Sequence, residues 1–208
     1  ELGWELRVAI ETVMDEGDTF LVEERLHGTE HSCELIFGIH GELQFFNIVD
    51  RPFKYANGVP MELGHVNPTK LSVSEQTDIY AMCVQAAHGL GVSWGPFKCD
   101  VILTKAGPKI LEATTRLSGG FDCQYTTPVS TGKSPIGYLI DLCQGLTPLR
   151  AHLTQKWGKY AAACAAFPKP GLVDMIQCPL FRQPDIKEIR DGRVFSLIVA
   201  KPGDTIPR

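Results

Sequence analysis

Two acidic residues, Asp100 and Glu112, could together hold a metal ion. Strand-like residues surround each of them, and we expect the two to lie opposite each other across a β-hairpin. Directly opposed Cβ atoms are roughly 5 Å apart, a distance at which like charges repel unless a cation lies between them. Carboxylate oxygens suit Mg²⁺, particularly when phosphate supplies its remaining ligands. The alternative is that both acids are solvated on an exposed strand face.

The hairpin that would position these acids is predicted from the residues around Gly107. We expect strands over 97–104 and 108–116, joined by a three-residue loop that ends on the glycine in the left-handed region. The predicted cross-strand pairs are Thr104 with Pro108, Leu103 with Lys109, Asp100 with Glu112, and Lys98 with Thr114. Because side chains alternate along a strand, one face collects five polar residues. These are Lys98, Asp100, Glu112, Thr114 and Arg116.

A guanidinium group and a glycine-rich turn follow the second acid. Arg116 lies near the end of the second predicted strand, and the turn is Ser118-Gly119-Gly120. Arginine binds phosphate and carboxylate groups through paired donors, and the backbone N–H groups of such a turn can bind an anion. Beside a metal site, this combination is suited to phosphoryl transfer.

These motifs, in this order, resemble the C-terminal half of ATP-grasp enzymes, and most of all the carboxylate–amine ligases such as the L-amino-acid (dipeptide) ligases. The resemblance covers roughly residues 20–146 and extends more loosely over the tail. It implies that Asp100 and Glu112 hold Mg²⁺. Thr114 stands where the family usually has asparagine, and its hydroxyl is the third candidate ligand. Arg116 matches the arginine that steadies the transferred phosphoryl group and the acyl phosphate.

The segment 22–30 resembles the part of ATP-grasp enzymes that binds adenosine. The nucleotide-binding residues that the resemblance implies are Glu23, Glu24, Leu26 and Glu30. The first three would contact the adenine edge, and Glu30 would accept hydrogen bonds from the ribose hydroxyls. For Glu34 and Glu42 we expect solvated positions on a strand face.

The segment 50–69 is rich in Pro, Gly and Asn and predicts a long loop, which in a compact domain is often functional. Within it, MELGHVNP resembles the ligase segment that faces the substrate carboxylate and a second Mg²⁺. This implies a substrate-binding role for Glu62 and a catalytic role for His65, whose charged form nearby phosphate would favour. The alternative for His65 is a loop histidine bonded to backbone. Gly119 is the expected N–H donor to substrate.

The predicted fold class is α+β: an antiparallel sheet flanked by helices, as in the ATP-grasp C-terminal subdomain, followed by a small β-rich lobe. The expected domains are residues 1–150 and 151–208. We expect helices over 5–16, 71–90 and 131–145, and further strands over 20–26, 27–38 and 41–49. The helix over 71–90 has a capping box, Ser72 with Glu75, and an apolar stripe. The stripe consists of Ile79, Cys83, Ala86, Ala87 and Leu90.

Composition excludes several classes of protein. The chain has 208 residues and a net charge of −4, so no basic surface for nucleic acid or an anionic membrane is expected. It has no apolar run long enough to span a bilayer, and its first residues lack the basic region and apolar block of a signal peptide, so none is expected. Its seven scattered cysteines predict core positions in a reducing cytoplasm. His27 and His31 have the spacing of a helical zinc pair, but they lie in a strand-like region, so a solvated or packed role is preferred.

The function that follows from the resemblance is an ATP-dependent ligase that joins a carboxylate to an amine (or thiol) through an acyl phosphate. Its cofactors would be ATP and Mg²⁺, with two ions expected and Mn²⁺ as a substitute, and a homodimer is left open. Family members hold the phosphates with a preceding half, so we expect a fragment of a longer enzyme, with weak nucleotide binding and no turnover alone. The alternatives are biotin-carboxylase-like or purine-pathway chemistry, or a degenerate lobe that serves as an interaction domain.

Overall fold

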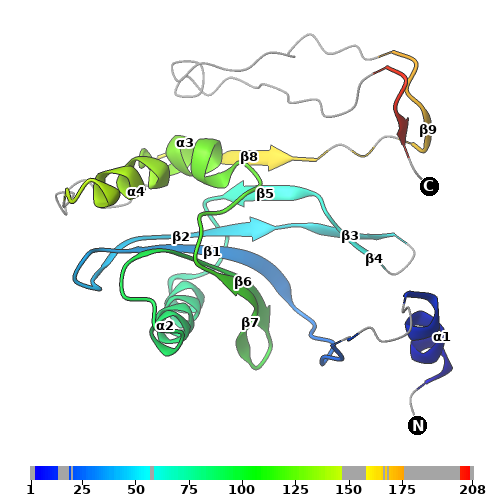
Figure 1. Ribbon diagram of the computed structural model, residues 1–208, viewed down its shortest axis with the longest axis horizontal. Coiled ribbons are helices and arrows are strands. Elements are labelled where there is room, and N and C mark those ends of the chain that lie inside the picture. The colour runs from blue at the N-terminus through cyan, green and yellow to red at the C-terminus, as the bar shows by residue number, and fades with distance from the viewer. Residues whose placement is uncertain are drawn as a thin grey trace.

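A computed structural model of the protein describes residues 3–13, 19, 21–56, 59–146, 158–165, 167, 169–175 and 202–206. Its centre is a six-stranded sheet of β1 (Thr29–Phe37), β2 (Leu43–Arg51), β5 (Gly64–Asn67), β6 (Gly95–Thr104), β7 (Gly107–Thr114) and β8 (Ala161–Cys164). The strand order is β7-β6-β1-β2-β5-β8, and neighbouring strands are antiparallel (Figure 1). The predicted α+β class with an antiparallel sheet is therefore confirmed.

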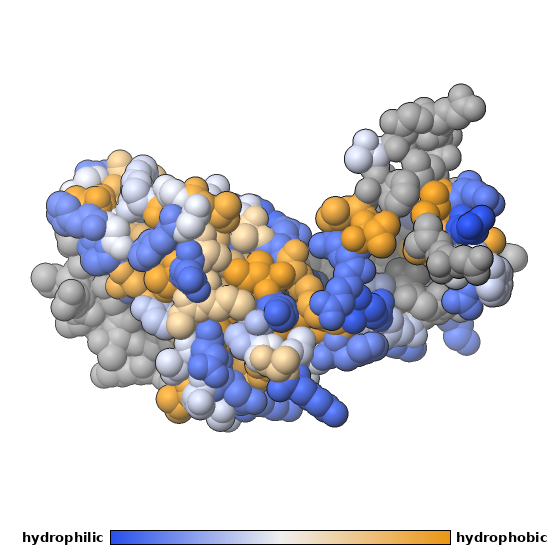
Figure 2. Space-filling model, turned by 90° about the horizontal axis from the view of Figure 1, so that it is seen from below, coloured by the Kyte–Doolittle hydropathy of each residue, from blue (hydrophilic) through white to orange (hydrophobic). Residues whose placement is uncertain are grey.

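One face of the sheet is apolar and packs against helix α2 (Val73–Gly89). Alternate residues of the central strands form this core with the helix, namely Cys33, Leu35, Phe37, Phe97, Cys99, Val101, Ile79, Cys83 and Ala87. The capping box of Ser72 and Glu75 is present as predicted. Leu90 is exposed, contrary to the predicted stripe, because the helix ends at Gly89. Seen from the side of α2, apolar residues gather in the middle of the surface between polar ones (Figure 2).

The opposite face of the same strands is polar. Paired residues in a sheet project to the same side, so the register fixes which side chains meet. The pairs on this face are Glu30 with Arg51, Ser32 with Asp100, Glu34 with Asn47, and Glu34 with Lys98. Several of these polar side chains are buried, among them Glu34, Asn47, Lys98 and Asp100. The segment after β7 contributes to this burial, because it crosses the sheet toward helix α3 (Thr127–Thr131) (Figure 1).

The β6–β7 hairpin has a shorter turn than predicted. Thr104 pairs with Gly107, so the turn consists of Lys105 and Ala106 alone, and the pairs predicted next to the turn are wrong by one residue. A β-bulge between the Asp100 and Val101 pairs then shifts the register by one residue. As a result, Asp100 lies opposite Glu112, and Lys98 opposite Thr114, as predicted.

The segment 50–69 is not the structureless loop that its composition predicted. It contains a hairpin of β3 (Phe53–Ala56) and β4 (Val59–Glu62), and then β5, which joins the main sheet beside β2. The strand predicted over 20–26 is also wrong, because residues 21–26 have no regular secondary structure and Leu21 is exposed. A strand needs a neighbour for its backbone groups, and no described strand pairs with this segment.

The helix predicted over 131–145 is present but shorter, and two helical segments that were not predicted precede it. A π-helix, η1 (Asp122–Thr126), runs directly into α3, and helix α4 (Pro135–Cys143) begins after its N-cap, Ser134. The Pro at the first position of α4 suits a helix start, because its missing N–H has no partner there anyway. α4 contributes Tyr138 and Leu142 to a second core cluster with Ile36 and Phe45 on the sheet.

The remaining described elements are short. Helix α1 (Trp4–Val13) lies away from the sheet, and residues 14–16 of the predicted helix lie outside the described residues (Figure 1). In the segment predicted to be a separate lobe, β8 joins the main sheet beside β5, and β9 (Gly171–Leu172) pairs with β10 (Thr205–Ile206). The two-domain division stays a prediction, because much of 151–208 is outside the described residues.

Neither described helices nor described cysteines point to a membrane or a disulfide framework. No helix among the described residues has the length and apolarity needed to cross a bilayer. The six described cysteines are free, and four of them (Cys33, Cys83, Cys99 and Cys123) are buried, as small core residues are. Cys178 lies outside the described residues.

Candidate functional site

Six side chains of alternating charge form a continuous chain over the polar face of the sheet. In order, they are Asp122, His65, Glu62, Arg51, Asp100 and Lys98. They come from η1, β5, β4, β2 and β6, elements that the sheet and the crossing segment bring together. The chain joins the predicted substrate-binding residues to the predicted metal ligand Asp100. With His65 protonated, the six charges sum to zero.

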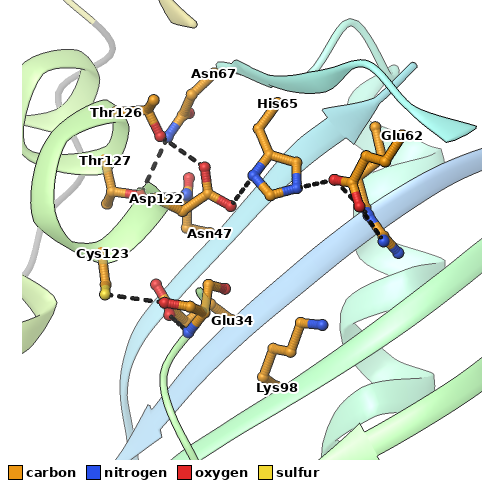
Figure 3. Close-up of polar contacts among 12 residues, drawn as sticks. Glu34, Asn47, Glu62, His65, Asn67, Lys98, Asp122, Cys123, Thr126 and Thr127 are labelled. Atoms are coloured by element: carbon orange, nitrogen blue, oxygen red, sulfur yellow. Dashed lines mark hydrogen bonds and ion pairs between the residues drawn. The ribbon is translucent and has the colours of Figure 1, made fainter. Parts of the chain in front are cut away.

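His65 lies between two carboxylates (Figure 3). Its Nδ1 is 2.7 Å from Oδ2 of Asp122, and its Nε2 contacts Oε1 of Glu62. Burial by itself would lower the pKa of His65, but the two facing carboxylates outweigh it and raise the pKa to about 9. An imidazole with an acceptor at each ring nitrogen is held as the doubly protonated cation. His65 is therefore a fixed positive charge at neutral pH, which fits the charged form expected from the sequence.

Arg51 links the two acidic centres of the chain. Its Nη2 donates to Oε2 of Glu62 at 2.6 Å and its Nε to Oε1 at 3.2 Å, a bidentate pair. Burial tends to raise the pKa of Glu62, but His65 and Arg51 outweigh it and lower the pKa to about 2. The Nη1 of Arg51 also lies 3.1 Å from Oδ1 of Asp100. Glu62 is therefore ionised and held between two cations.

Asp100 is surrounded by positive charge. Besides Arg51, the ammonium of Lys98 lies 2.6 Å from its Oδ2. Lys98 and Asp100 are both buried. Glu112, the opposed acid on β7, is exposed, and Thr114 lies across from Lys98. The two predicted ligands thus share a face, but the protein supplies Asp100 with two cations of its own.

The predicted acids fit a metal ion that brings most of its ligands with it. Among the described residues, no three His, Cys, Asp or Glu side chains are close enough together to hold a metal ion by themselves. Mg²⁺ commonly binds through one or two carboxylates and fills its other positions with phosphate oxygens and water. Oδ1 of Asp100 is buried and, although it lies 3.1 Å from Nη1 of Arg51, accepts no well-aligned hydrogen bond within the described part of the chain. Asp100 and Glu112 would therefore fit a phosphate-bound Mg²⁺. Asp100 would then contact three cations: the metal ion, Arg51 and Lys98.

The glycine-rich turn after β7 packs directly on His65. Gly120 has a φ of +51°, and a Cβ at this position would collide with Cε1 of the imidazole ring. Asp122, two residues later, holds Nδ1 of the same ring. Gly119 is exposed, and its carbonyl accepts from the N–H of Asp122 at 3.1 Å. The turn and His65 are therefore one packed unit, in which only glycine fits at position 120.

A matched pair of glycine substitutions would test this packing. Gly120→Ala is expected to lower the free energy of unfolding by more than about 1–2 kcal/mol, the cost of a left-handed alanine alone, because the methyl group must also displace His65. Gly119→Ala is the control, because an added Cβ there meets nothing within 4 Å. Chemical denaturation of the two variants measures both values. Equal stability of the two variants would contradict the packing.

The other predicted site residues are not members of the charge chain, and they differ in burial. Glu30 is half-buried on the polar face opposite Arg51, and burial is the main cause of its raised pKa. Arg116 is exposed, and its Nη1 donates to the carbonyl of Leu117 at 3.1 Å. The three predicted adenine-contacting residues lie in the segment without regular secondary structure. Of these, Glu23 and Glu24 are exposed and Leu26 is half-buried.

Sequence reasoning assigned no role in the site to four residues in or beside the polar face: Arg51, Asp122, Lys98 and Glu34. Arg51 follows the alternation of β2, and a strand predicted two residues longer would have included it. Lys98 was placed on the correct face, but without its pairing to Asp100. Asp122 lies in a π-helix that no local pattern predicts. Glu34 was expected to be solvated, and this is wrong, because the side chain is 3% exposed beneath the segment that crosses the sheet.

Comparisons with known proteins agree with this architecture. A family model described as an ATP-grasp domain matches residues 4–124. Phosphoribosylglycinamide synthetase from Anaerococcus prevotii matches with a TM-score of 0.69 and 16% identity, over 88% of this chain and 45% of that one. L-amino acid ligase from Bacillus licheniformis matches with a TM-score of 0.58 and 17% identity, over 73% of this chain and 39% of that one. These identities establish the fold alone.

A third solved structure carries ligands. The biotin carboxylase domain dimer of 2-oxoglutarate carboxylase from Hydrogenobacter thermophilus, in complex with MgADP, ADP and bicarbonate, has a TM-score of 0.58 and 15% identity. The match covers 89% of this chain and 40% of that one. The chain thus spans less than half the length of each of these three structures. No curated protein sequence matches it.

Proposed function

Because the chain belongs to the ATP-grasp domain family, we propose that it is the C-terminal part of a longer ATP-dependent ligase, which joins a carboxylate to an amine or thiol. The share of each relative that it covers supports the proposal of a larger enzyme. Two of the matched structures are a synthetase and a ligase, which supports bond formation as the reaction class. The observation that carries the proposal is the cross-strand opposition of Asp100, which is buried among charged side chains, and Glu112, which is exposed.

The proposed reaction has two steps. In the first, a carboxylate oxygen of the substrate attacks the terminal phosphorus of ATP, so that an acyl phosphate forms and ADP leaves. In the second, the amine attacks the acyl carbon, phosphate leaves, and the amine nitrogen loses a proton. No enzyme nucleophile is needed, because positioning and charge neutralisation lower the barrier of phosphoryl transfer.

The side chains would divide this work by charge. Asp100 and Glu112, with Thr114 as a third ligand, would hold Mg²⁺, which neutralises phosphate charge when bound. Arg116 would stabilise the transferred phosphoryl group, to which its exposed position gives access. His65, held as a cation between Asp122 and Glu62, would contribute positive charge near the substrate carboxylate without donating to it, because both of its ring nitrogens already face carboxylates. The N–H of Gly119 would donate to the substrate from the exposed turn.

The nucleotide would bind along residues 22–30, the segment that leads into β1. Glu30 is the best supported of these residues, because it is half-buried on the same face as Arg51 and Asp100. A carboxylate there could accept from both ribose hydroxyls. Glu23, Glu24 and Leu26 would supply adenine contacts. This part of the proposal rests on the family resemblance.

A second candidate function is a non-catalytic ATP-grasp lobe. The pairing of both Asp100 oxygens with Arg51 and Lys98 favours it, because these cations already provide the charge that a metal ion would supply. Thr114 in the place of the family's asparagine points the same way. Such a lobe would bind partners or nucleotide without turnover.

The deciding experiment is ADP formation by the full-length protein. Incubation with Mg-ATP and a panel of carboxylates, each with and without amines and thiols, should give ADP only when a carboxylate and a nucleophile are both present. Mg-ATP binding without ADP formation across the panel would favour the non-catalytic lobe. The 208-residue chain alone is expected to bind Mg-ATP weakly, and tight binding by the chain would contradict that part of the proposal.

A further inference from the structure

Glu34 is a buried acid at the centre of the polar face. Its Oε1 accepts from the backbone N–H of Ser118 at 2.6 Å, a contact between residues 84 positions apart in the chain. Ser118 begins the glycine-rich turn, so the hydrogen bond ties the turn to the middle of β1. A short bond to a buried carboxyl group is among the stronger hydrogen bonds a protein makes. No role in the proposed reaction has been given to Glu34.

The second carboxyl oxygen of Glu34 has no hydrogen-bond donor among the described residues. Oε2 is buried without a hydrogen-bond partner in the described part of the chain, and so is Oδ1 of Asn47, the cross-strand neighbour of Glu34. Asn47 uses its Nδ2 to donate to Thr127 at 3.1 Å. The closest cation by register, Lys98, is paired with Asp100 instead. Buried acceptors without a donor are costly, and protonation of Glu34 would lower the cost of burying its own carboxyl group.

The glycine-rich turn is held at each of its residues. Ser118 donates its N–H to Glu34, and its carbonyl accepts from Sγ of Cys123 at 3.0 Å. The carbonyl of Gly119 accepts from Asp122, and Gly120 packs on the ring of His65. Of these contacts, only the one with Glu34 comes from β1, at the centre of the sheet. The others come from η1 or from β5.

We propose that Glu34 is a positioning residue, which fixes the start of the glycine-rich turn so that Gly119 and Gly120 keep their places beside His65. The effect of this positioning on substrate binding rests on the proposed ligase function, in which the N–H of Gly119 donates to the substrate. The positioning itself needs neither nucleotide nor metal. Removal of the carboxyl group should loosen the turn while α2 and its apolar core stay intact, because they lie on the other face.

The protonation of Glu34 gives this contact a spectroscopic signature. Burial is the main cause of a rise in the pKa of Glu34 to about 7, and Asp122 adds to it. The hydrogen bond from Ser118 and the charge of Lys98 act in the opposite direction. Cys123, whose own pKa burial raises to about 11, stays a neutral thiol beside the turn. The Ser118 amide therefore faces a neutral acid below about pH 7 and a carboxylate above it.

Amide NMR of the ¹⁵N-labelled 208-residue chain tests the proposal without nucleotide or metal. Between about pH 5 and about pH 9, the Ser118 resonance should shift with an inflection near 7, well above the ordinary value for a glutamate. Glu34→Gln should keep the fold and abolish the inflection. Glu11→Gln, the same change on an exposed position of α1, should leave it in place. Absence of the inflection in the natural chain, or its survival in Glu34→Gln, would overturn the proposal.

Hydrogen exchange supplies a second measurement. Glu34→Ala removes the acceptor, and we expect the Ser118 amide to exchange at least about tenfold faster while amides of α2 keep their protection. Unchanged protection of Ser118 would overturn the proposal. If Glu34→Ala does not fold, the titration of the isosteric Glu34→Gln variant decides the matter.

The full-length enzyme separates this inference from the proposed function. If it is a ligase, Glu34→Ala should raise KM for the carboxylate several-fold with a smaller change in kcat, and Glu34→Gln should change KM less, because its amide oxygen still accepts from Ser118. An inflection at Ser118 in a protein that makes no ADP would uphold the positioning role and defeat the ligase proposal. ADP formation by a protein that shows no inflection at Ser118 would uphold the ligase proposal and defeat the positioning role.

Discussion

Glu112→Gln is expected to reduce ADP formation by the full-length protein at least about a hundredfold, the scale of losing one group that stabilises charge in the transition state. Glutamine has nearly the same size but carries no charge, so it cannot offset the charge of a phosphate-bound Mg²⁺. Glu112 is exposed and lies opposite Asp100, so its loss should remove a ligand without disturbing the core. Initial rates of ADP release at saturating ATP measure the effect.

Two further variants make this test specific. Glu42→Gln, on the connection between β1 and β2, is the control and should keep full activity. Asp100→Asn should also lose activity, but it should destabilise the protein as well, because it weakens the pairing with Arg51 and Lys98. A near-normal rate of ADP release in Glu112→Gln would show that the metal assignment is wrong.

Rising pH is expected to destabilise the chain through His65. Its pKa is about 9 in the folded protein, above the ordinary value of 6.5. A group with a raised pKa stabilises the fold fully below its unfolded pKa and loses that contribution as pH rises through the folded pKa. The free energy of unfolding should therefore fall by about 3 kcal/mol between about pH 6.5 and about pH 9, at 1.36 kcal/mol for each unit of pKa.

Substitution of His65 should remove this dependence. His65→Gln leaves Glu62 and Asp122 without their shared cation, and we expect a loss of about 3–5 kcal/mol at pH 6 together with a flat profile between about pH 8 and about pH 9, above the range in which Glu34 titrates. His27→Gln is the matched control, because His27 is exposed. Urea denaturation at a series of pH values measures all three proteins. A flat profile in the natural chain would contradict the charged state of His65.

Local sequence patterns predicted the elements whose formation depends on near neighbours. The capping box of Ser72 and Glu75 marked the start of α2, and the alternation along 97–104 placed Lys98 and Asp100 on one face. The hairpin pairing of Asp100 with Glu112 also followed, although the turn is shorter than predicted. The β-bulge offsets that error. The extra residue of β7 at the bulge makes up for the residue missing from the turn, so the predicted pairing of the two acids is restored.

Predictions failed where the outcome depends on distant residues. The segment 50–69 has the composition of a loop, yet part of it is held as strands because β2 and β8 offer partners on both sides of β5. The segment 21–26 has the composition of a strand, yet no described strand pairs with it. In both cases, the availability of a partner decided the structure, and propensity did not.

The amino-acid sequence by itself determined the antiparallel hairpin, the face that carries its acids and the helix that covers the apolar side. These depend on periodicity and on contacts a few residues apart, which any short stretch of chain displays. Only the tertiary structure decided that His65 is clamped by Glu62 and Asp122, that Arg51 and Lys98 neutralise Asp100, and that Glu34 is buried. Each of these depends on which segments pack over the polar face of the sheet and which side chains they meet there. Burial and charge pairing between remote residues are properties of the assembled fold, and they set the pKa values on which the chemistry of this site depends.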